Sequence, residues 1–142
     1  MGGVDTLLIG EAPIPQFDPV THYLVEVAAT AVNRADILQR EGKYPPQPGI
    51  TNILGLEAAG RIVSEAEKNV MCLLPGGGYA QFVAVDKRHC IQIPNSLTME
   101  QAAGIMEVWL TAFQLLKWEG ELNRKETVLV HAAASGVGTA AI

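Results

Sequence analysis

The sequence is poor in cysteine, in clustered basic residues and in long apolar runs, and each scarcity excludes a class of protein. Cys72 and Cys90 are the only cysteines in 142 residues, too few for a disulfide scaffold, so a reducing compartment is expected. No apolar run approaches the roughly 18 residues that cross a membrane. Basic residues are scattered, and the net charge of -5 disfavours nucleic acid and anionic membranes as partners. We therefore expect a cytoplasmic protein with neither a nucleic-acid nor a membrane partner.

What the sequence does contain is a series of short strand patterns followed by helical ones. Strands are predicted over residues 6–9, 23–29, 70–74, 79–85 and 90–94, and a further apolar strand is predicted within residues 54–63, after the segment 55–60 (GLEAAG). Asn33 is suited to cap a helix that runs to Arg40 and stops at Gly42. The order predicts an α/β protein: a β-rich domain over residues 1–96, joined to the start of an α/β domain over residues 97–142.

The second part begins with helices. Residues 98–101 (TMEQ) form a capping box that opens a helix carrying Ala102, Ala103 and Ile105. A second helical run follows, and its apolar residues lie on about one face: Trp109, Leu110, Ala112, Phe113 and Leu116. After a polar segment, residues 127–130 read as a buried strand of the parallel type.

A glycine turn after this last strand carries the clearest functional signal. Gly136, Gly138 and Ala141 match the G-x-G-x-x-G/A pattern of dinucleotide-binding units; in a second register Ala133, Ser135 and Gly138 occupy the small positions. Small residues let backbone N–H groups approach a pyrophosphate, and the following helix presents its positive end to the phosphates. An ordinary glycine turn after a buried strand explains the same residues without a ligand.

Several stretches taken together resemble one family. They are residues 33–36 (NRAD), 39–44 (QREGKY), 55–60 (GLEAAG), 74–80 (LPGGGYA), 109–112 (WLTA) and 135–138 (SGVG). Their order along almost the whole chain resembles the zinc-independent quinone oxidoreductases of the medium-chain dehydrogenase/reductase superfamily. The resemblance is strongest to the branch that holds the tumour-suppressor-induced quinone oxidoreductase.

The resemblance implies an NADPH-dependent reductase with a GroES-like catalytic domain and a Rossmann domain. Hydride would pass from the nicotinamide of NADPH to a quinone or an activated alkene such as an enone. By match of position, Asn33 and Tyr44 would line the nicotinamide and substrate as catalytic residues, and Thr111 would lie near the cofactor. The pyrophosphate would be held by Ala133, Ser135, Gly136, Val137 and Gly138.

Read without the family, the same residues have simpler roles. Asn33 is equally suited to be only a helix cap. Tyr44 could cover the edge of the core, although its phenol can also polarise a carbonyl. Thr111 in a helix commonly bonds its own backbone. Glu57 is either a buried, paired carboxylate or a solvated strand end.

No metal is expected. The zinc-dependent relatives carry a histidine between the glycine and the glutamate of a Gly-x-Glu motif, and this position is Leu56 here. None of His22, His89 and His131 stands at ligand spacing with a cysteine, and a zinc site needs three or four converging ligands.

The departures from the family lead us to expect a truncated, inactive polypeptide. The first strand of the family pattern is missing, the link over residues 64–69 is short, and the ribose-reading segment that would follow Ile142 is absent. An alternative is a non-catalytic fragment that interacts with a full-length homologue, and a small-molecule binding module is a third possibility. Self-association is expected in either case, because the last strand would be left uncovered.

Overall fold

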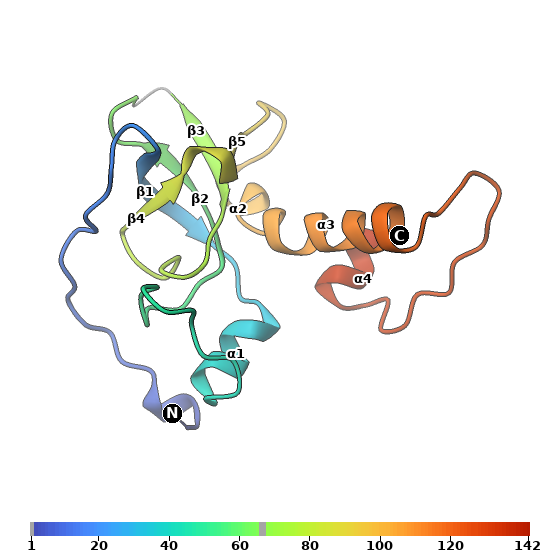
Figure 1. Ribbon diagram of the computed structural model, residues 1–142, viewed down its shortest axis with the longest axis horizontal. Helices are drawn as coiled ribbons and strands as arrows, with labels where there is room; N and C mark the ends of the chain where they lie inside the picture. The colour runs from blue at the N-terminus through green and yellow to red at the C-terminus, as the bar shows by residue number, and fades with distance from the viewer. Residues whose placement is uncertain (1, 66–67) are drawn as a thin grey trace.

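The computed structural model describes residues 2–65 and 68–142 and divides into a β-rich unit and a helical arm (Figure 1). The sheet is formed by β1 (His22–Thr30), β2 (Glu57–Ile62), β3 (Asn69–Leu73), β4 (Phe82–Asp86) and β5 (Cys90–Gln92). Its strand order is β4-β1-β2-β3-β5, and every neighbouring pair is antiparallel. Five of the predicted strands are therefore confirmed, as is the β-rich first part of the chain.

Two buried clusters lie on the sheet, one on each face, which explains why its central strands are so apolar. One buried cluster gathers Val25, Ala58, Ile62, Val70, Cys72, Leu74, Val83 and Val85. The other joins the opposite face of β2 and β3 to the helices, through Ala59, Met71, Ile93, Ala102, Ala103 and Met106. Alternate residues of β2 thus serve different clusters, as the two-residue period of a strand requires.

A β-bulge interrupts the ladder between β1 and β2. Val27 pairs with Gly60, but Ala29 pairs with Ala59, so Ala28 is an extra residue on β1. The two strands lie very close together here: a Cβ on Gly60 would collide with the carbonyl oxygen of Glu26. The bulge brings the end of β1 to the start of β2, where the Thr30 hydroxyl donates to the Glu57 carbonyl over 2.7 Å.

The prediction of a strand over residues 6–9 is wrong. The chain instead forms a 3₁₀ turn, η1 (Val4–Thr6), in which the N–H of Thr6 donates to the Gly3 carbonyl. Leu8 and Ile9 that follow are almost fully exposed. Their apolar character suits a strand, but no strand of the described residues pairs with them, and an unpaired segment does not persist as a strand.

The helix after Asn33 is confirmed as α1 (Arg34–Arg40), and Gly42 beyond its end has the positive φ of 76° that favours glycine. The predicted capping box begins α2 (Met99–Ala102): the Thr98 hydroxyl accepts from the Gln101 N–H over 3.2 Å. A short 3₁₀ turn, η2 (Lys87–His89), connects β4 to β5.

The helical arm consists of α3 (Met106–Phe113), a π-helical continuation η3 (Gln114–Glu119) and α4 (Gly136–Ala141). In Figure 1, α3 leads away from the sheet, and α4 lies against α3. Residues 127–130, predicted as a buried strand, are an irregular segment, and Leu129 is 81% exposed. A parallel-type strand is stable only between neighbours that cover it, and no described strand lies beside this one.

Candidate functional site

A buried carboxylate joins the sheet to the first turn of the helical arm. Glu57, at the start of β2, is 1% exposed. Its Oε1 accepts from Asn33 Nδ2 over 2.8 Å, and its Oε2 accepts from the backbone N–H of Glu107 over 3.0 Å. The N–H groups of a first helical turn have no partner within the helix, and a carboxylate there is also favoured by the helix dipole. Of the two readings of Glu57, the buried and paired one is therefore correct.

A second buried carboxylate, Asp36, organises the loops around α1. Its side chain accepts from the N–H of Asn33 over 2.8 Å, from the N–H of Gly55 over 3.0 Å and from the Tyr79 hydroxyl over 3.0 Å. Three donors stabilise a charged carboxylate in the interior. Burial, followed by the hydrogen bond to Asp36, raises the pKa of the Tyr79 phenol, which therefore stays protonated as a donor.

Two glycines allow this loop arrangement. Gly55 has a φ of 104°, and a Cβ on it would lie 2.6 Å from the Cα of Gly78. The segments before β2 and before β4 thus touch backbone to backbone, with the Gly78 N–H donating to the Gly55 carbonyl over 3.0 Å. This contact holds Tyr79 beside Asp36.

Glu57 and Asp36 make the site acidic, and the pKa of a third carboxyl group, that of Glu107, is raised beside them. The Glu107 carboxyl is half-buried, and its pKa is raised first by burial and then by the charges of Glu57 and Asp36. Negative charges gathered in a region of low dielectric oppose a further ionisation.

The two predicted catalytic residues have very different surroundings. Asn33 is 8% exposed and stands at the N-cap of α1, as predicted, but its Nδ2 donates to Glu57. That bond fixes the amide and leaves Oδ1 as an acceptor. Tyr44 lies in the loop after α1 and is 51% exposed. Asn33 is thus hydrogen-bonded to the acidic cluster of Asp36, Glu57 and Glu107, whereas Tyr44 lies at the surface.

The predicted cofactor-binding residues lie on the helical arm. Thr111 is half-buried on α3, and its hydroxyl donates to the Glu107 carbonyl over 2.6 Å, the local role that was the simpler alternative. Ser135 caps α4 by accepting from the Gly138 N–H over 3.1 Å. The other members of the predicted turn are Ala133, Gly136 and Val137.

Close packing explains the two glycines of this turn. A Cβ on Gly138 would collide with the carbonyl oxygen of Ala132, and a Cβ on Gly136 would lie 3.0 Å from Cγ1 of Val108 on α3. Ala132 itself adopts a positive φ of 51°. A tight turn with unsubstituted positions toward its neighbours fits the predicted cradle, because the first-turn N–H groups of Gly136 and Val137 have no acceptor within the helix.

The remaining polar features do not add a second site. Across residues 2–65 and 68–142, no three His, Cys, Asp or Glu side chains converge as metal ligands. Leu56 is buried and apolar. In the same two ranges no helix has the length and apolar character needed to span a membrane. Two surface hollows of about 210 and 310 Å³ are lined by other residues, among them Tyr23 and Lys87 in the first and Arg61 and Met99 in the second.

Sequence reasoning missed Asp36 and Tyr79 as members of the site. Asp36 carried a usable signal, because an acidic residue three positions after an N-cap can accept from the N-cap N–H. Tyr79 carried none, since its partner lies 43 residues away.

Comparison with known proteins agrees with this architecture. Residues 20–95, more than half of the chain, match the alcohol dehydrogenase GroES-like domain family. Among curated proteins, the synaptic vesicle membrane protein VAT-1 homolog of Rattus norvegicus is 31% identical over 150 residues, covering 99% of this chain and 37% of that protein. The chain thus spans little more than a third of the length of this relative.

Solved structures extend the likeness to the fold. The quinone oxidoreductase of Thermus thermophilus, described together with its NADPH complex, matches 93% of the chain and 43% of its own, with a TM-score of 0.80 and 33% identity. A human synaptic vesicle membrane protein VAT-1 homolog-like protein matches 99% of the chain and 48% of its own, with a TM-score of 0.89 and 25% identity. The resemblance inferred from the short motifs is therefore confirmed.

Proposed function

Because the chain belongs to the alcohol dehydrogenase GroES-like domain family, within the medium-chain dehydrogenase/reductase superfamily, we propose that it forms the catalytic-domain part of an NADPH-dependent reductase. The substrate class is a quinone or an activated alkene. The division at residues 96 and 97 places the sheet in the catalytic part and the helical arm in the nucleotide-binding part.

One observation carries the proposal. The Thermus thermophilus quinone oxidoreductase, whose structure includes an NADPH complex, superposes on 93% of this chain at 33% identity. The overlap includes most of the sheet and the arm together, so it supports a shared arrangement of the two parts.

On this proposal the pyrophosphate of NADPH is held by the turn from Ser135 to Gly138, together with Ala133. The first-turn N–H groups of Gly136 and Val137 donate to it, while the Ser135 hydroxyl is kept in place by the Gly138 N–H. Thr111 contributes the side of α3 that faces the cofactor. When bound, NADPH supplies the hydride.

Asn33 and Tyr44 act at the reacting end. Glu57 holds the Asn33 amide, so its Oδ1 is oriented before ligand binding and accepts a hydrogen bond from the nicotinamide end of the cofactor. The Tyr44 phenol donates a hydrogen bond to the substrate oxygen, on which negative charge develops during reduction. Its exposure gives an incoming substrate direct access to the hydroxyl.

A chimera tests the proposal. Residues 1–142 replace the matching segment of the Thermus thermophilus quinone oxidoreductase, and folding is checked by circular dichroism. NADPH oxidation with a soluble quinone is then followed without oxygen. We expect turnover that Tyr44→Phe lowers about 10²-fold, as for loss of one donor to a developing oxyanion. Tyr23→Phe, a phenol on β1 covered by the Lys87 ammonium, is the matched control.

A folded chimera without turnover would count against the reductase proposal. An active chimera in which Tyr44→Phe and Tyr23→Phe behave alike would count against the role of Tyr44.

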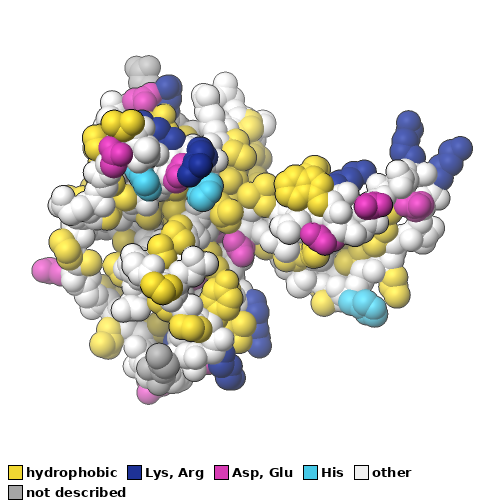
Figure 2. Space-filling view, in the orientation of Figure 1, with side chains coloured by type: hydrophobic (Ala, Val, Ile, Leu, Met, Phe, Trp, Pro, Cys, Tyr) yellow, Lys and Arg dark blue, Asp and Glu magenta, His cyan; other side chains and the backbone are white. Residues whose placement is uncertain are grey.

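A second candidate function is that of a non-catalytic partner of a homologue, and one observation favours it. Hydrophobic side chains are exposed along the helical arm (Figure 2): Trp109 by 56%, Phe113 by 52% and Trp118 by 70%. The last two contact each other edge to face at 5.7 Å. Apolar surface of this kind is usually covered by another protein surface. We predict that the 142-residue polypeptide self-associates, and a monodisperse monomer in light scattering would refute this.

A further inference from the structure

The two cysteines of the sequence lie opposite each other in the sheet. Cys72 on β3 and Cys90 on β5 are Cα partners in the antiparallel ladder. Their Sγ atoms are 3.6 Å apart, although 18 residues separate them in the chain. Both are free thiols in the structure.

The ladder pattern shows that this pair is suited to a cross-link. The Ile93 N–H donates to the Asn69 carbonyl over 3.0 Å, so these two residues form a hydrogen-bonded pair. Hydrogen-bonded and non-hydrogen-bonded pairs alternate, which makes Cys72 and Cys90, three steps further, a non-hydrogen-bonded pair with Cα atoms about 4.5 Å apart. Disulfides span Cα separations of about 4.4–6.8 Å. Side-chain rotation can therefore close the bond without moving either strand far.

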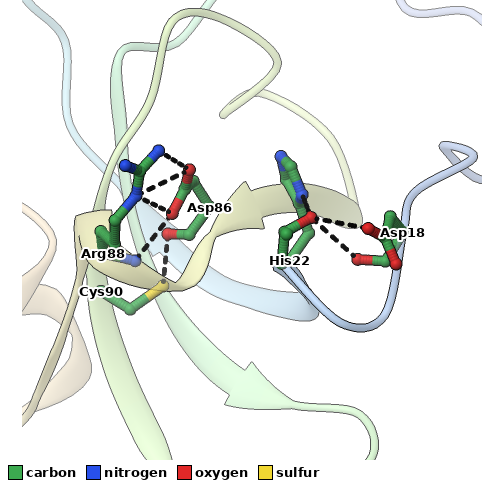
Figure 3. A network of polar contacts seen from close by, with 6 residues as sticks. Asp18, His22, Asp86, Arg88 and Cys90 are labelled. Atoms are coloured by element: carbon green, nitrogen blue, oxygen red, sulfur yellow. Dashed lines mark hydrogen bonds and ion pairs between the residues drawn. The ribbon is translucent and has the colours of Figure 1, made fainter.

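The two thiols differ in access. Cys72 is fully buried, whereas Cys90 is half-buried on β5, the short strand at one edge of the sheet. Figure 3 shows the Cys90 sulfur directed at the carbonyl oxygen of Asp86, over 3.6 Å, beside the ion pair of Asp86 and Arg88. Cys90 is therefore the thiol that a small reagent reaches first.

The pKa values of the two thiols also differ, and they too favour Cys90 as the reactive thiol. The hydrogen bond with Cys72 lowers the pKa of Cys90, while the same bond and burial raise the pKa of Cys72. The thiolate is the reactive form of cysteine, so the nucleophile is Cys90 and the resolving thiol is Cys72.

We propose that Cys72 and Cys90 are a redox-sensitive pair that forms a reversible cross-strand disulfide on reaction with a hydroperoxide. The Cys90 sulfur attacks one peroxide oxygen and the O–O bond breaks; the Cys90 proton leaves with the other oxygen, as water when the reagent is hydrogen peroxide. The product is a sulfenic acid on Cys90. The Cys72 sulfur then attacks the Cys90 sulfur, the S–O bond breaks, and the hydroxyl leaves with the Cys72 proton as a second water. Two thiols are oxidised and one peroxide is reduced.

The cross-link would fix β5 to β3. Only three residues of β5 pair with the sheet, so a covalent bond in this strand restrains both the edge and the segment that leads to α2. A disulfide also restricts the unfolded chain. We therefore expect the oxidised protein to melt at a higher temperature than the reduced one.

The test treats the reduced 142-residue chain with hydrogen peroxide and measures the intact mass. The expected product has lost two hydrogen atoms, gives a linked peptide containing Cys72 and Cys90 on non-reducing digestion, and returns to two thiols with dithiothreitol. Over-oxidised Cys90 without the linked peptide, or dimers linked between chains, would overturn the proposal for the wild-type protein without any variant.

Two variants separate the roles of the cysteines. Cys72→Ser should stop at the Cys90 sulfenic acid, which dimedone traps. Cys90→Ser should leave the buried Cys72 thiol unreacted under the same conditions. Oxidation of Cys72 in Cys90→Ser at the wild-type rate would show that Cys90 is not the nucleophile and would also overturn the proposal.

Discussion

Removal of the Glu57 carboxylate should disconnect the sheet from the helical arm. In Glu57→Ala, the Asn33 side chain and the Glu107 N–H both lose their acceptor. A buried donor left without a partner costs about 1–3 kcal/mol. Asn33 is buried, while the Glu107 N–H is partly accessible and can bind water, and the loss of one charge from an acidic cluster offsets part of the cost. We expect a loss of about 2–4 kcal/mol in the free energy of unfolding.

Glu57→Gln is the matched control, because it keeps the shape of the side chain. The glutamine Oε1 can accept from the Glu107 N–H. The Asn33 amide can turn over so that its Oδ1 accepts from the glutamine Nε2. Both contacts survive, and the loss of stability should stay within about 1 kcal/mol.

Urea unfolding followed by circular dichroism measures both variants, with the midpoint compared at constant slope. If Glu57→Ala lies within about 0.5 kcal/mol of wild type, the carboxylate is not a structural link. If Glu57→Gln is as damaging as Glu57→Ala, the charge and not the hydrogen-bond geometry is what matters, and the reasoning fails in that respect.

The pH dependence offers an independent readout of the same cluster. The pKa of Glu107 is raised above its ordinary value of 4.5 in the folded chain, so ionising it opposes folding. Stability is therefore fully present below pH 4.5 with respect to this group, and is lost as the pH rises through the raised pKa. Glu57→Gln should lower that pKa, because one of the charges that raises it is removed. An unchanged Glu107 titration by NMR would contradict this.

Further predictions concern the turn, metal and activity. Gly138→Ala places a Cβ against the carbonyl of Ala132 and should unfold α4 with a loss of helical circular dichroism, whereas Gly10→Ala, in open space, should not; equal spectra would refute this. No zinc near one equivalent per chain should be found by elemental analysis, because Leu56 cannot ligate; near-stoichiometric zinc would refute this. The 142-residue polypeptide should oxidise no NADPH with a quinone above a denatured control, because residues 127–130 form no strand to support the turn at residues 135–138 that we propose for the cofactor; turnover would refute it.

The sequence predicted the elements whose formation depends on local pattern. β1 to β5 alternate or run apolar between clear turn residues, and α1 and α2 begin at recognisable caps. Residues 6–9 and 127–130 were predicted as strands on composition alone. Both failed for one physical reason: a strand exists only through its pairing with another strand, and nothing in a short apolar run says whether a partner is present.

Only those parts of the candidate site that local sequence determines were predictable. The place of Asn33 at a helix start follows from local sequence, and so does the small-residue turn before α4. The bonds that give the site its character join Glu57 to residue 107, and Asp36 to Tyr79. They link segments about 40–50 residues apart, and no local pattern encodes such contacts. The cysteine pair is hidden for the same reason, since only the register of β3 and β5 sets it.

The extra residue at Ala28 has a consequence for how this region tolerates change. An alanine scan passes over the position, which is already alanine and exposed, and most substitutions there should be silent. Deletion of Ala28 should be tolerated as well. Two residues of β1 oppose one residue of β2 at the bulge, so without Ala28 the ladder becomes regular, with Val27 still opposite Gly60 and Ala29 still opposite Ala59. The acidic cluster thus depends on the pairing of Ala29 with Ala59, and hardly on the residue that forms the bulge.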